Sequence, residues 1–425
     1  VNRDEQEVLA AIDVDGLVET LCELIAIPSE GGFETPAQRR VAALMESFGM
    51  EVDVWDIDFD ALRLHPAYTV EIEREHGLGV VGTLGRSRGG DGGRTLILNG
   101  HIDVVPAGEL DRWHYPPWRG TLADGRIYGR GSADMKGGLC CALFAARAIV
   151  ETGIELPGRL MIQSVIGEED GGAGTLAAVE RGYCGDAATD AAIIMEPTEL
   201  MIAPAQAGAF GFRITVPGVA AHAAFREEGV DPIEKFIPIY QALREFETAR
   251  NRSVTDPMFS AYEIPFALCV GKLQCGVWAS TVAEALICEG RLGVAIDEDS
   301  KQVREALDNR VREAALADPW LRDHPPTVEW TGAQFEPAAI DADHRIVTTL
   351  FDSFRDATGD NAIVRGMPYG ADMRLLVHQG RTPTVLFGPG NVRHAHAPDE
   401  FVTVDELIAT TKSLALTALR FCGGS

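Results

Sequence analysis

Three apolar runs in the first half of the chain have the length of buried strands, and each ends in polar or charged residues. They cover residues 94–98, 159–166 and 191–195, and helical apolar spacing occurs at 15–27, 35–49 and 139–150. Continuous apolar strands that alternate with helices are typical of α/β domains. We therefore predict an α/β domain in which helices flank a mixed, mostly parallel sheet.

The periodicity changes after residue 208. Apolar residues occupy every second position from Phe210 to Val216, which predicts a strand with one buried face and one face toward solvent. Asp231-Pro232-Ile233-Glu234 has the pattern of a capping box at the start of a long helix, and residues 300–317 are amphipathic. We predict a smaller α+β domain inserted into the α/β domain, with segment bounds at 1–208, 209–331 and 332–425.

The last segment returns to the pattern of the first. Residues 343–357 have helical spacing and are followed by Gly359, and residues 382–387 form an apolar run. Thr403 and Glu406 have the spacing of a capping box. We predict a helix, a buried strand and a final helix here, all belonging to the α/β domain.

Composition and charge narrow the classes of partner. The chain has 37 Lys and Arg against 64 Asp and Glu, and its net charge of −27 argues against binding nucleic acid or an anionic membrane. The longest apolar run, at 139–150, is too short to cross a bilayer, and the acidic N-terminus does not resemble a secretion signal. The 8 cysteines are scattered without a C-x-x-C pair, which is typical of reduced side chains in a cytoplasmic protein.

Chemically active side chains follow the apolar runs, at the sheet edge where open α/β proteins place their sites. An additional carboxylate, Asp134, lies in a glycine-rich segment before the apolar stretch at 139–150. The residues at the ends of the three runs are His101 and Asp103, Glu168 and Glu169, and Glu196.

Each of these residues also has an ordinary interpretation. A histidine at a strand end can simply hydrogen-bond its neighbour, and a single acid in a loop is usually solvated. The glycines around Asp134 could cradle a phosphate, although the G-x-x-x-x-G-K-[ST] pattern is absent. Gathered together, however, carboxylates repel one another unless a cation neutralises them. Two divalent ions would balance Asp134, Glu169, Glu196 and a bridging hydroxide, which favours a dinuclear metal site.

Five motifs occur in a fixed order along the chain. They are H-I-D-V-V-P at His101, G-R-G-S-A-D-M-K-G-G at Asp134, G-E-E-D-G-G at Glu168, M-E-P-T at Glu196 and A-H-A-P-D-E-F at His396. In this order the motifs resemble the dinuclear zinc amidohydrolase and exopeptidase family of acetylornithine deacetylase, succinyl-diaminopimelate desuccinylase, aminoacylase and glutamate carboxypeptidase. The resemblance spans nearly the whole chain. It implies a split catalytic domain that is interrupted by a lid or dimerisation domain.

The resemblance also implies a role for each motif residue. The implied metal ligands are His101, Asp134, Glu169, Glu196 and His396. Asp134 would bridge the two ions, Glu196 would share one ion with His101, and Glu169 would share the other with His396. Asp103 would orient His101 and Glu168 would act as the general base. The family further places a cis peptide after the bridging aspartate, here between Asp134 and Met135.

Substrate contacts are expected from the inserted domain and from the last segment. The sequence G-V-A-A-H-A-A resembles the family loop whose histidine reaches the substrate carbonyl, often from a partner subunit, so His222 is the expected oxyanion donor. Many relatives have an asparagine where this chain has Ser280, whose side chain can still donate a hydrogen bond but has a shorter reach. Arg374 resembles an arginine that holds a substrate carboxylate, with a salt bridge to Asp372 as an equal alternative. The predicted substrate-binding residues are Ser280, Gly370, Arg374 and Asn391.

These observations predict a metal-dependent hydrolase that cleaves an amide C–N bond in a small molecule. We expect two divalent metal ions, with zinc preferred and cobalt or manganese as alternatives, and the resemblance implies a homodimer formed through the lid. The favoured reaction is deacylation of an N-acyl amino acid. The alternatives are a carboxypeptidase or dipeptidase, an aminohydrolase or amidase for an unusual aromatic substrate, and an inactive metal-binding protein.

Overall fold

The computed structural model describes residues 1–85, 93–185 and 188–423. The chain divides into two compact units, each described by itself. Unit 1 contains Val1–Ala205, Ala338–Arg365 and Ala371–Ser425, and unit 2 contains Gln206–Pro337 and Gly366–Gly370. Unit 2 extends past residue 331 because strand β14 (Thr327–Phe335) pairs with β9 (Gly208–Pro217) both before and after a bulge between Trp330 and Gln334. The short return segment belongs to unit 2 because the Gly366 amide donates to the Met258 carbonyl at 3.0 Å.

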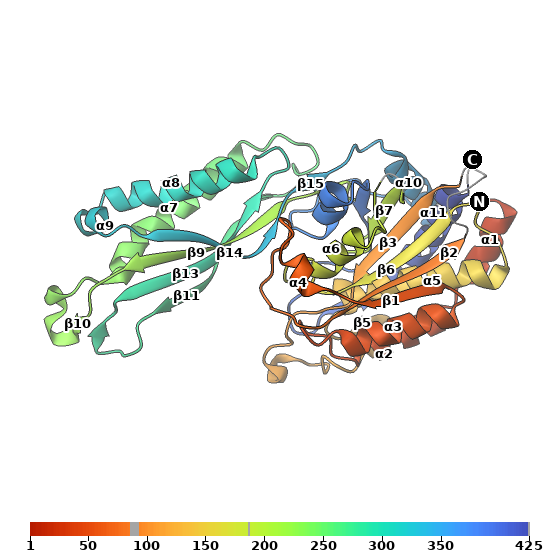
Figure 1. Cartoon of the computed structure of the whole chain (residues 1–425), viewed down its shortest axis with the longest axis horizontal. Coiled ribbons are helices and arrows are strands. Elements are labelled where there is room, and N and C mark those ends of the chain that lie inside the picture. The colour runs from red at the N-terminus through yellow and green to blue at the C-terminus, as the bar shows by residue number, and fades with distance from the viewer. Residues whose placement is uncertain (86–92, 186–187, 424–425) are drawn as a thin grey trace. The chain divides into compact units, whose positions relative to one another are not determined.

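Unit 1 is built on a six-stranded sheet (Figure 1). In spatial order its strands are β1 (Glu51–Asp56), β2 (Leu78–Gly85), β6 (Arg159–Val165), β3 (Thr95–His101), β7 (Ala191–Ile194) and β16 (Thr384–Leu386). The last four of these run parallel, whereas β1 and β2 pair antiparallel. The predicted mixed, mostly parallel sheet is therefore confirmed. Strands β3, β7 and β16 are buried at every residue, which is why each has apolar residues at consecutive positions and not at alternate ones.

Helices cover both faces of this sheet. Asn99 of β3 donates from Nδ2 to Thr175 Oγ1 of α6 at 3.2 Å, while a Cβ on the next residue, Gly100, would lie 3.4 Å from the Leu139 Cβ of α5. Because successive strand residues point to opposite faces, α5 and α6 lie on opposite sides. The helices are α1 (Arg3–Ala10), α2 (Val14–Ile25), α3 (Thr35–Ser47), α4 (Phe59–Leu62), α5 (Gly137–Thr152), α6 (Ala173–Glu180), α10 (Arg345–Thr358) and α11 (Val404–Cys422).

Outside the six-stranded sheet of unit 1, shorter strands form two small sheets. A three-stranded sheet joins segments far apart in sequence, with β17 pairing on β5 and β5 on β4. A two-stranded pairing of β8 with β15 lies where the chain passes between the two units. These elements are β4 (Thr121–Ala123), β5 (Arg126–Tyr128), β17 (Phe401–Thr403), β8 (Ala205–Gln206), β15 (Ala338–Ala339), and the helical turns η1 (Leu110–Arg112), η2 (Ser132–Lys136) and η4 (Leu375–Gln379).

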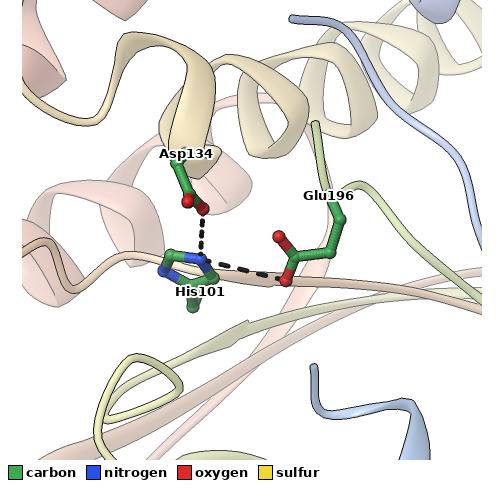
Figure 2. Close-up of side chains that lie close together, drawn as sticks. All are labelled: His101, Asp134 and Glu196. Atoms are coloured by element: carbon green, nitrogen blue, oxygen red, sulfur yellow. Dashed lines mark hydrogen bonds and ion pairs between the residues drawn. The ribbon is translucent and has the colours of Figure 1, made fainter. Parts of the chain in front are cut away.

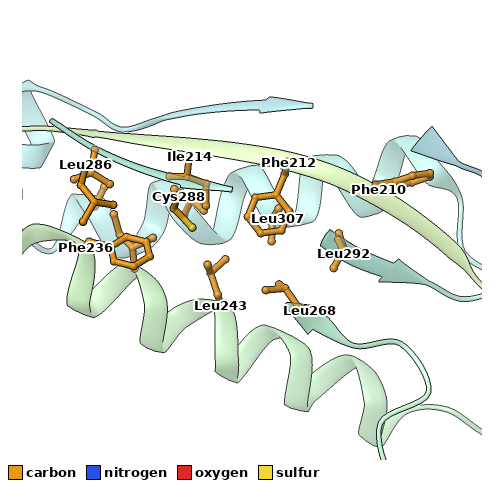
Figure 3. Close-up of a cluster of buried hydrophobic side chains, with 14 of the residues drawn as sticks. Phe210, Phe212, Ile214, Phe236, Leu243, Leu268, Leu286, Cys288, Leu292 and Leu307 are labelled. Atoms are coloured by element: carbon orange, nitrogen blue, oxygen red, sulfur yellow. The ribbon is translucent and has the colours of Figure 1, made fainter. Parts of the chain in front are cut away.

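Unit 2 is a four-stranded antiparallel sheet with helices packed against one face (Figure 3). Its strand order is β11, β13, β9, β14. Every second residue of β9, from Phe210 to Val216, packs on helices α7 and α8, while Arg213 on the other face pairs with Glu289 at 2.6 Å. The remaining elements are β11 (Leu268–Cys275), β13 (Ala285–Val294), α7 (Pro232–Arg252), α8 (Ser300–Leu316), α9 (Pro319–Asp323), β10 (Ala221–His222), β12 (Thr281–Val282) and η3 (Ala223–Glu228).

Helix caps explain where two of these helices begin. The predicted capping box is present at Thr403 and Glu406, at the start of α11. At α7 the prediction is half wrong. The Asp231 side chain caps the helix by accepting from the Ile233 amide at 2.9 Å, but Glu234 pairs with Arg226 and does not return the second bond.

Within the described part of the chain, no helix has the length and apolar character needed to cross a membrane.

Candidate metal centre

The residues predicted as metal ligands come together in unit 1, at the edge where the parallel strands end. His101 is the last residue of β3, and the loops after the neighbouring strands β6 and β7 bring acids to the same edge. Asp134 comes from the turn η2, where the predicted cis peptide with Met135 is present. The residues brought together are His101, Asp134, Glu169, Glu196 and His396.

Two groups of ligand atoms share Asp134. In the first, which we call the buried group, His101 Nε2 lies 3.1 Å from Asp134 Oδ1 and 3.9 Å from Glu196 Oε1 (Figure 2). In the second, the open group, His396 Nε2 lies 3.0 Å from Glu169 Oε2 and 3.6 Å from Asp134 Oδ2. Within each group the candidate ligand atoms lie within 4.8 Å of one another. The two oxygens of one carboxylate therefore face two different imidazoles.

The backbone sets the tautomer of His101. Its Nδ1 lies 2.9 Å from the carbonyl oxygen of Asp103, and a carbonyl can only accept, so Nδ1 carries the proton. Nε2, which faces Asp134 and Glu196, is therefore the ring nitrogen that would bind a metal ion in place of a proton. The Asp103 carboxylate lies farther away, with Oδ1 at 3.7 Å from Nδ1, and its Oδ2 accepts from the Glu169 amide at 3.1 Å. Asp103 thus contacts a member of each group.

Electrostatics indicate that this centre needs positive charge. Burial raises the pKa of Glu196, and the charge of Asp134 raises it further. Burial lowers the pKa of both histidines, but hydrogen bonds to Asp134 and the charges of the surrounding acids together outweigh it. The pKa of His101 therefore stays well above its usual range, and that of His396 rises to about 11. Among the described residues, Glu196 Oε1 is buried without a hydrogen-bond partner. An available carboxylate oxygen and two imidazole nitrogens amid acids fit divalent metal ions.

Glu168 lies beside this cluster without belonging to either group. It is 7% exposed, and its pKa is raised well above the usual value by burial and by the charge of Glu196. A carboxyl group whose pKa is shifted upward next to a metal site is suited to taking and returning a proton. The loop that carries it is closed by the Gly171 amide, which donates to the Glu168 carbonyl at 3.1 Å.

Two residues that position Asp134 were not assigned a role from the sequence. Glu400 Oε1 accepts from the backbone amides of Ala133 at 3.0 Å and Asp134 at 3.1 Å, and Glu400 Oε2 pairs with Arg130 Nη1 at 2.5 Å. Both side chains are buried. The sequence signal that could have identified Glu400 was its position inside the A-H-A-P-D-E-F motif. Its partner Arg130, however, is 270 residues away in sequence. Only the fold identifies this pair.

Two predicted substrate residues lie next to each other in unit 2. His222 of β10 pairs in register with Thr281 of β12, and the Ala223 amide donates to the Ser280 carbonyl at 3.0 Å. His222 is exposed, and its Nδ1 accepts from the Ala224 amide at 3.1 Å, so its proton is on Nε2. This ring therefore presents an N–H donor to solvent.

The other predicted substrate residues are engaged within the protein. Arg374 is 3% exposed, and its Nη2 donates to the Gly171 carbonyl at 2.8 Å. Asn391 forms a β-bridge with Thr198, and its Oδ1 accepts from the Arg393 amide at 2.8 Å. Gly370 packs so closely that an added Cβ would lie 2.5 Å from the Phe335 Cβ. The substrate-binding roles of these three residues stay predictions.

Comparison with known proteins identifies the family. The model of peptidase family M20/M25/M40 matches residues 97–420. The chain is 31% identical, over 99% of its length and 96% of the relative, to N-formyl-4-amino-5-aminomethyl-2-methylpyrimidine deformylase of Halalkalibacterium halodurans. It is 28% identical to succinyl-diaminopimelate desuccinylase of Polynucleobacter necessarius, over 76% of this chain and 81% of the relative.

A solved structure supports the fold independently of sequence identity. The di-peptidase Dug1p of Saccharomyces cerevisiae superposes with a TM-score of 0.78 at 13% identity, covering 98% of each chain. At this identity the likeness concerns the fold, which agrees with the predicted α/β architecture. The family model, the deformylase and desuccinylase relatives and the two ligand groups at the strand ends lead to one conclusion. The chain belongs to peptidase family M20/M25/M40 and is a metal-dependent hydrolase.

Proposed function

We propose that the chain is an N-deacylase that hydrolyses the amide of a small molecule at a centre of two zinc ions. The observation that carries the proposal is the sharing of Asp134, whose Oδ1 lies 3.1 Å from His101 and whose Oδ2 lies 3.6 Å from His396. A carboxylate placed between two ligand groups can bridge two ions. Divalent ions at such a site polarise a carbonyl oxygen and lower the pKa of water from about 16 toward about 7.

The residues of the chain would perform the proton transfers. Glu168 is buried beside Glu196, and its raised pKa suits a group that takes a proton from the attacking water and later returns it to the leaving nitrogen. His101 would be held by the Asp103 carbonyl, and Glu400 would fix the backbone at Asp134. His222 has its proton on Nε2 and would donate it as a hydrogen bond to the developing oxyanion.

The first substrate to test is a formyl amide of an amine that carries a pyrimidine ring. The deformylase relative acts on such a compound by its name, and it matches 99% of this chain. Arg374, the residue expected to hold a substrate carboxylate, is 3% exposed and bound to the Gly171 carbonyl, which supports a substrate without a carboxylate there. An N-acyl amino acid is the second candidate, supported by the desuccinylase relative at 28% identity.

A substrate panel tests the proposal. The metal-free protein, reloaded with zinc, cobalt or manganese, would be given N-formyl-4-amino-5-aminomethyl-2-methylpyrimidine, N-succinyl-diaminopimelate, N-acetylornithine and a dipeptide, with the released amine measured by mass spectrometry. We expect the highest kcat/KM for the formyl amide and no hydrolysis by the metal-free protein. A preference for the dipeptide would overturn the deacylase assignment in favour of a peptidase.

We also propose a homodimer formed through unit 2, located in the cytoplasm. Strand β11 lies at an edge of its sheet, and Val277 and Trp278 in the following loop are exposed. All 8 cysteines are free thiols, which agrees with a reducing compartment. Sedimentation equilibrium at micromolar concentration tests the assembly, and a monomer under these conditions would contradict it.

A further inference from the structure

A buried ion cluster lies directly behind the loop that carries Glu168 and Glu169. It consists of Arg74, Glu34 and Asp170, whose side chains are 1%, 2% and 6% exposed. Arg74 donates from Nη2 and Nε to Glu34 Oε1 at 2.6 and 2.9 Å, and from Nη1 to Asp170 Oδ2 and Oδ1 at 2.7 and 3.0 Å. We call these three residues the Arg74 cluster. One guanidinium thus joins two acids that are far apart in the sequence.

The cluster fixes the backbone immediately after the proposed ligand. Asp170 follows Glu169, its Oδ2 also accepts from the Ile72 amide at 3.1 Å, and its carbonyl accepts from the Glu71 amide at 3.0 Å. On the other side, the Glu169 amide donates to Asp103 Oδ2 at 3.1 Å. The peptide unit before Glu169 and the peptide unit after Asp170 are therefore each held by a partner outside the loop.

The segment before Arg74 also packs against this loop without space between them. A Cβ on Gly171 would lie 1.8 Å from the Thr69 carbonyl oxygen, and Gly171 has a φ of +143°. A Cβ on Gly167 would lie 3.2 Å from the Arg74 Cζ. Only glycine permits so close an approach of two backbones. The loop and the segment at 69–74 therefore form one packed layer.

Burying these charges is a costly way to gain stability. Replacing a buried ion pair with apolar residues of similar volume is often neutral or stabilising, so stability alone does not explain the cluster. What a planar guanidinium adds is orientation, because its fork fixes direction as well as distance. We propose that Arg74, acting through Asp170, is a positioning residue that aims Glu168 and Glu169 at the metal centre. This inference rests on the proposed roles of those two glutamates.

Arg74→Lys separates charge from geometry. Lysine keeps the positive charge but offers a point charge in place of the fork, so it cannot hold both acids in their present geometry. We expect kcat and zinc affinity each to fall by about 10- to 100-fold, as when a residue that orients a metal ligand is lost. We expect KM to stay unchanged, because Arg74 does not contact the substrate.

The matched control is Arg40→Lys. Arg40 makes a similar forked pair with Glu23, at 2.6 and 2.8 Å, but on the surface between α3 and α2. Hydrogen exchange followed by mass spectrometry measures how fast the backbone amides of the loop exchange in the metal-free protein. Faster exchange in Gly167–Gly172 of Arg74→Lys, with Arg40→Lys unchanged, would support positioning. Unchanged exchange, kcat and zinc affinity in Arg74→Lys would overturn it.

Asp170→Asn provides a second variant that removes the charge and keeps the shape. If Arg74 acts through Asp170, the double variant should lose no more kcat than the worse single variant, whereas independent effects would multiply. Multiplying effects, or a lower melting temperature with unchanged kcat, would refute the positioning role. Zinc titration and hydrogen exchange need no substrate, so they test Arg74 even if the proposed substrate is wrong. Glu168→Gln in the same assay tests the proposed base separately.

Discussion

The two ligand groups that share Asp134 are built differently. In the buried group, His101 ends a strand and its side chain is 0% exposed, and Glu196 is 5% exposed. In the open group, His396 lies on a loop at a φ of +60° and is 54% exposed. The sheet therefore fixes one half of the centre, while a loop late in the chain completes the other half. Of the two groups, the open group is the one with a ligand that is mostly exposed.

Removing the shared carboxylate should have the largest effect, because it damages both groups at once. Asp134→Asn keeps the size of the side chain and removes its charge. We expect zinc content to fall at both groups and turnover to fall by about 1,000-fold or more, since several kcal/mol of metal-based stabilisation are lost together. Metal analysis and steady-state kinetics measure the two losses. Retention of one full equivalent of zinc would show that Asp134 serves only one group.

Glu168→Gln should separate proton transfer from metal binding. Glu168 lies next to the buried group but is not one of its ligands, so we expect both zinc ions to remain while turnover falls by about 100-fold. Metal content and kcat measure the two effects. Glu151→Gln is the control, because Glu151 pairs with Arg147 on the surface of α5. Unchanged turnover in Glu168→Gln would refute its assignment as the base.

The two histidines should differ in their contribution to stability. His101→Ala removes a buried partner of Asp134 and leaves acids unpaired, so the metal-free protein should lose about 3 kcal/mol of unfolding free energy. His396 is 54% exposed, and its removal should cost less than about 1 kcal/mol. Urea unfolding of the metal-free variants measures the difference. Equal losses would remove the distinction between a buried and an open group.

Chelation of the unaltered protein should give the smallest effect, and it compares the rates at which the two ligand groups lose zinc. We expect zinc to leave in two phases, with the open group losing its ion first because solvent reaches His396 and not His101. Rapid mixing with a chelator and a zinc-sensitive dye resolves the phases. The fast phase should be the one that disappears in His396→Ala. Release in a single phase would mean that the two ions are held as one unit.

Local pattern determined much of this molecule. Apolar runs of strand length identified β3, β6 and β7, and alternate apolar residues identified β9. This works because successive residues of a strand point to opposite faces, so the spacing of apolar residues shows whether one face or both are buried. The ordered motifs singled out the five residues that lie together at the strand ends. The α7 cap was only half predicted, because Glu234 has a better partner in Arg226 than in its own helix.

The amino-acid sequence by itself determined the fold class, the family and the set of acids and histidines that lie at one sheet edge. Tertiary structure alone decided which groups hold that set in place. Arg74 meets Asp170 across 96 residues and Glu400 meets Arg130 across 270, and no periodic pattern links such positions. The tautomer of His101 was likewise decided by the Asp103 carbonyl, which every residue type has and which therefore leaves no mark in the sequence. Partner choice between distant polar groups depends on which surfaces the fold brings into contact.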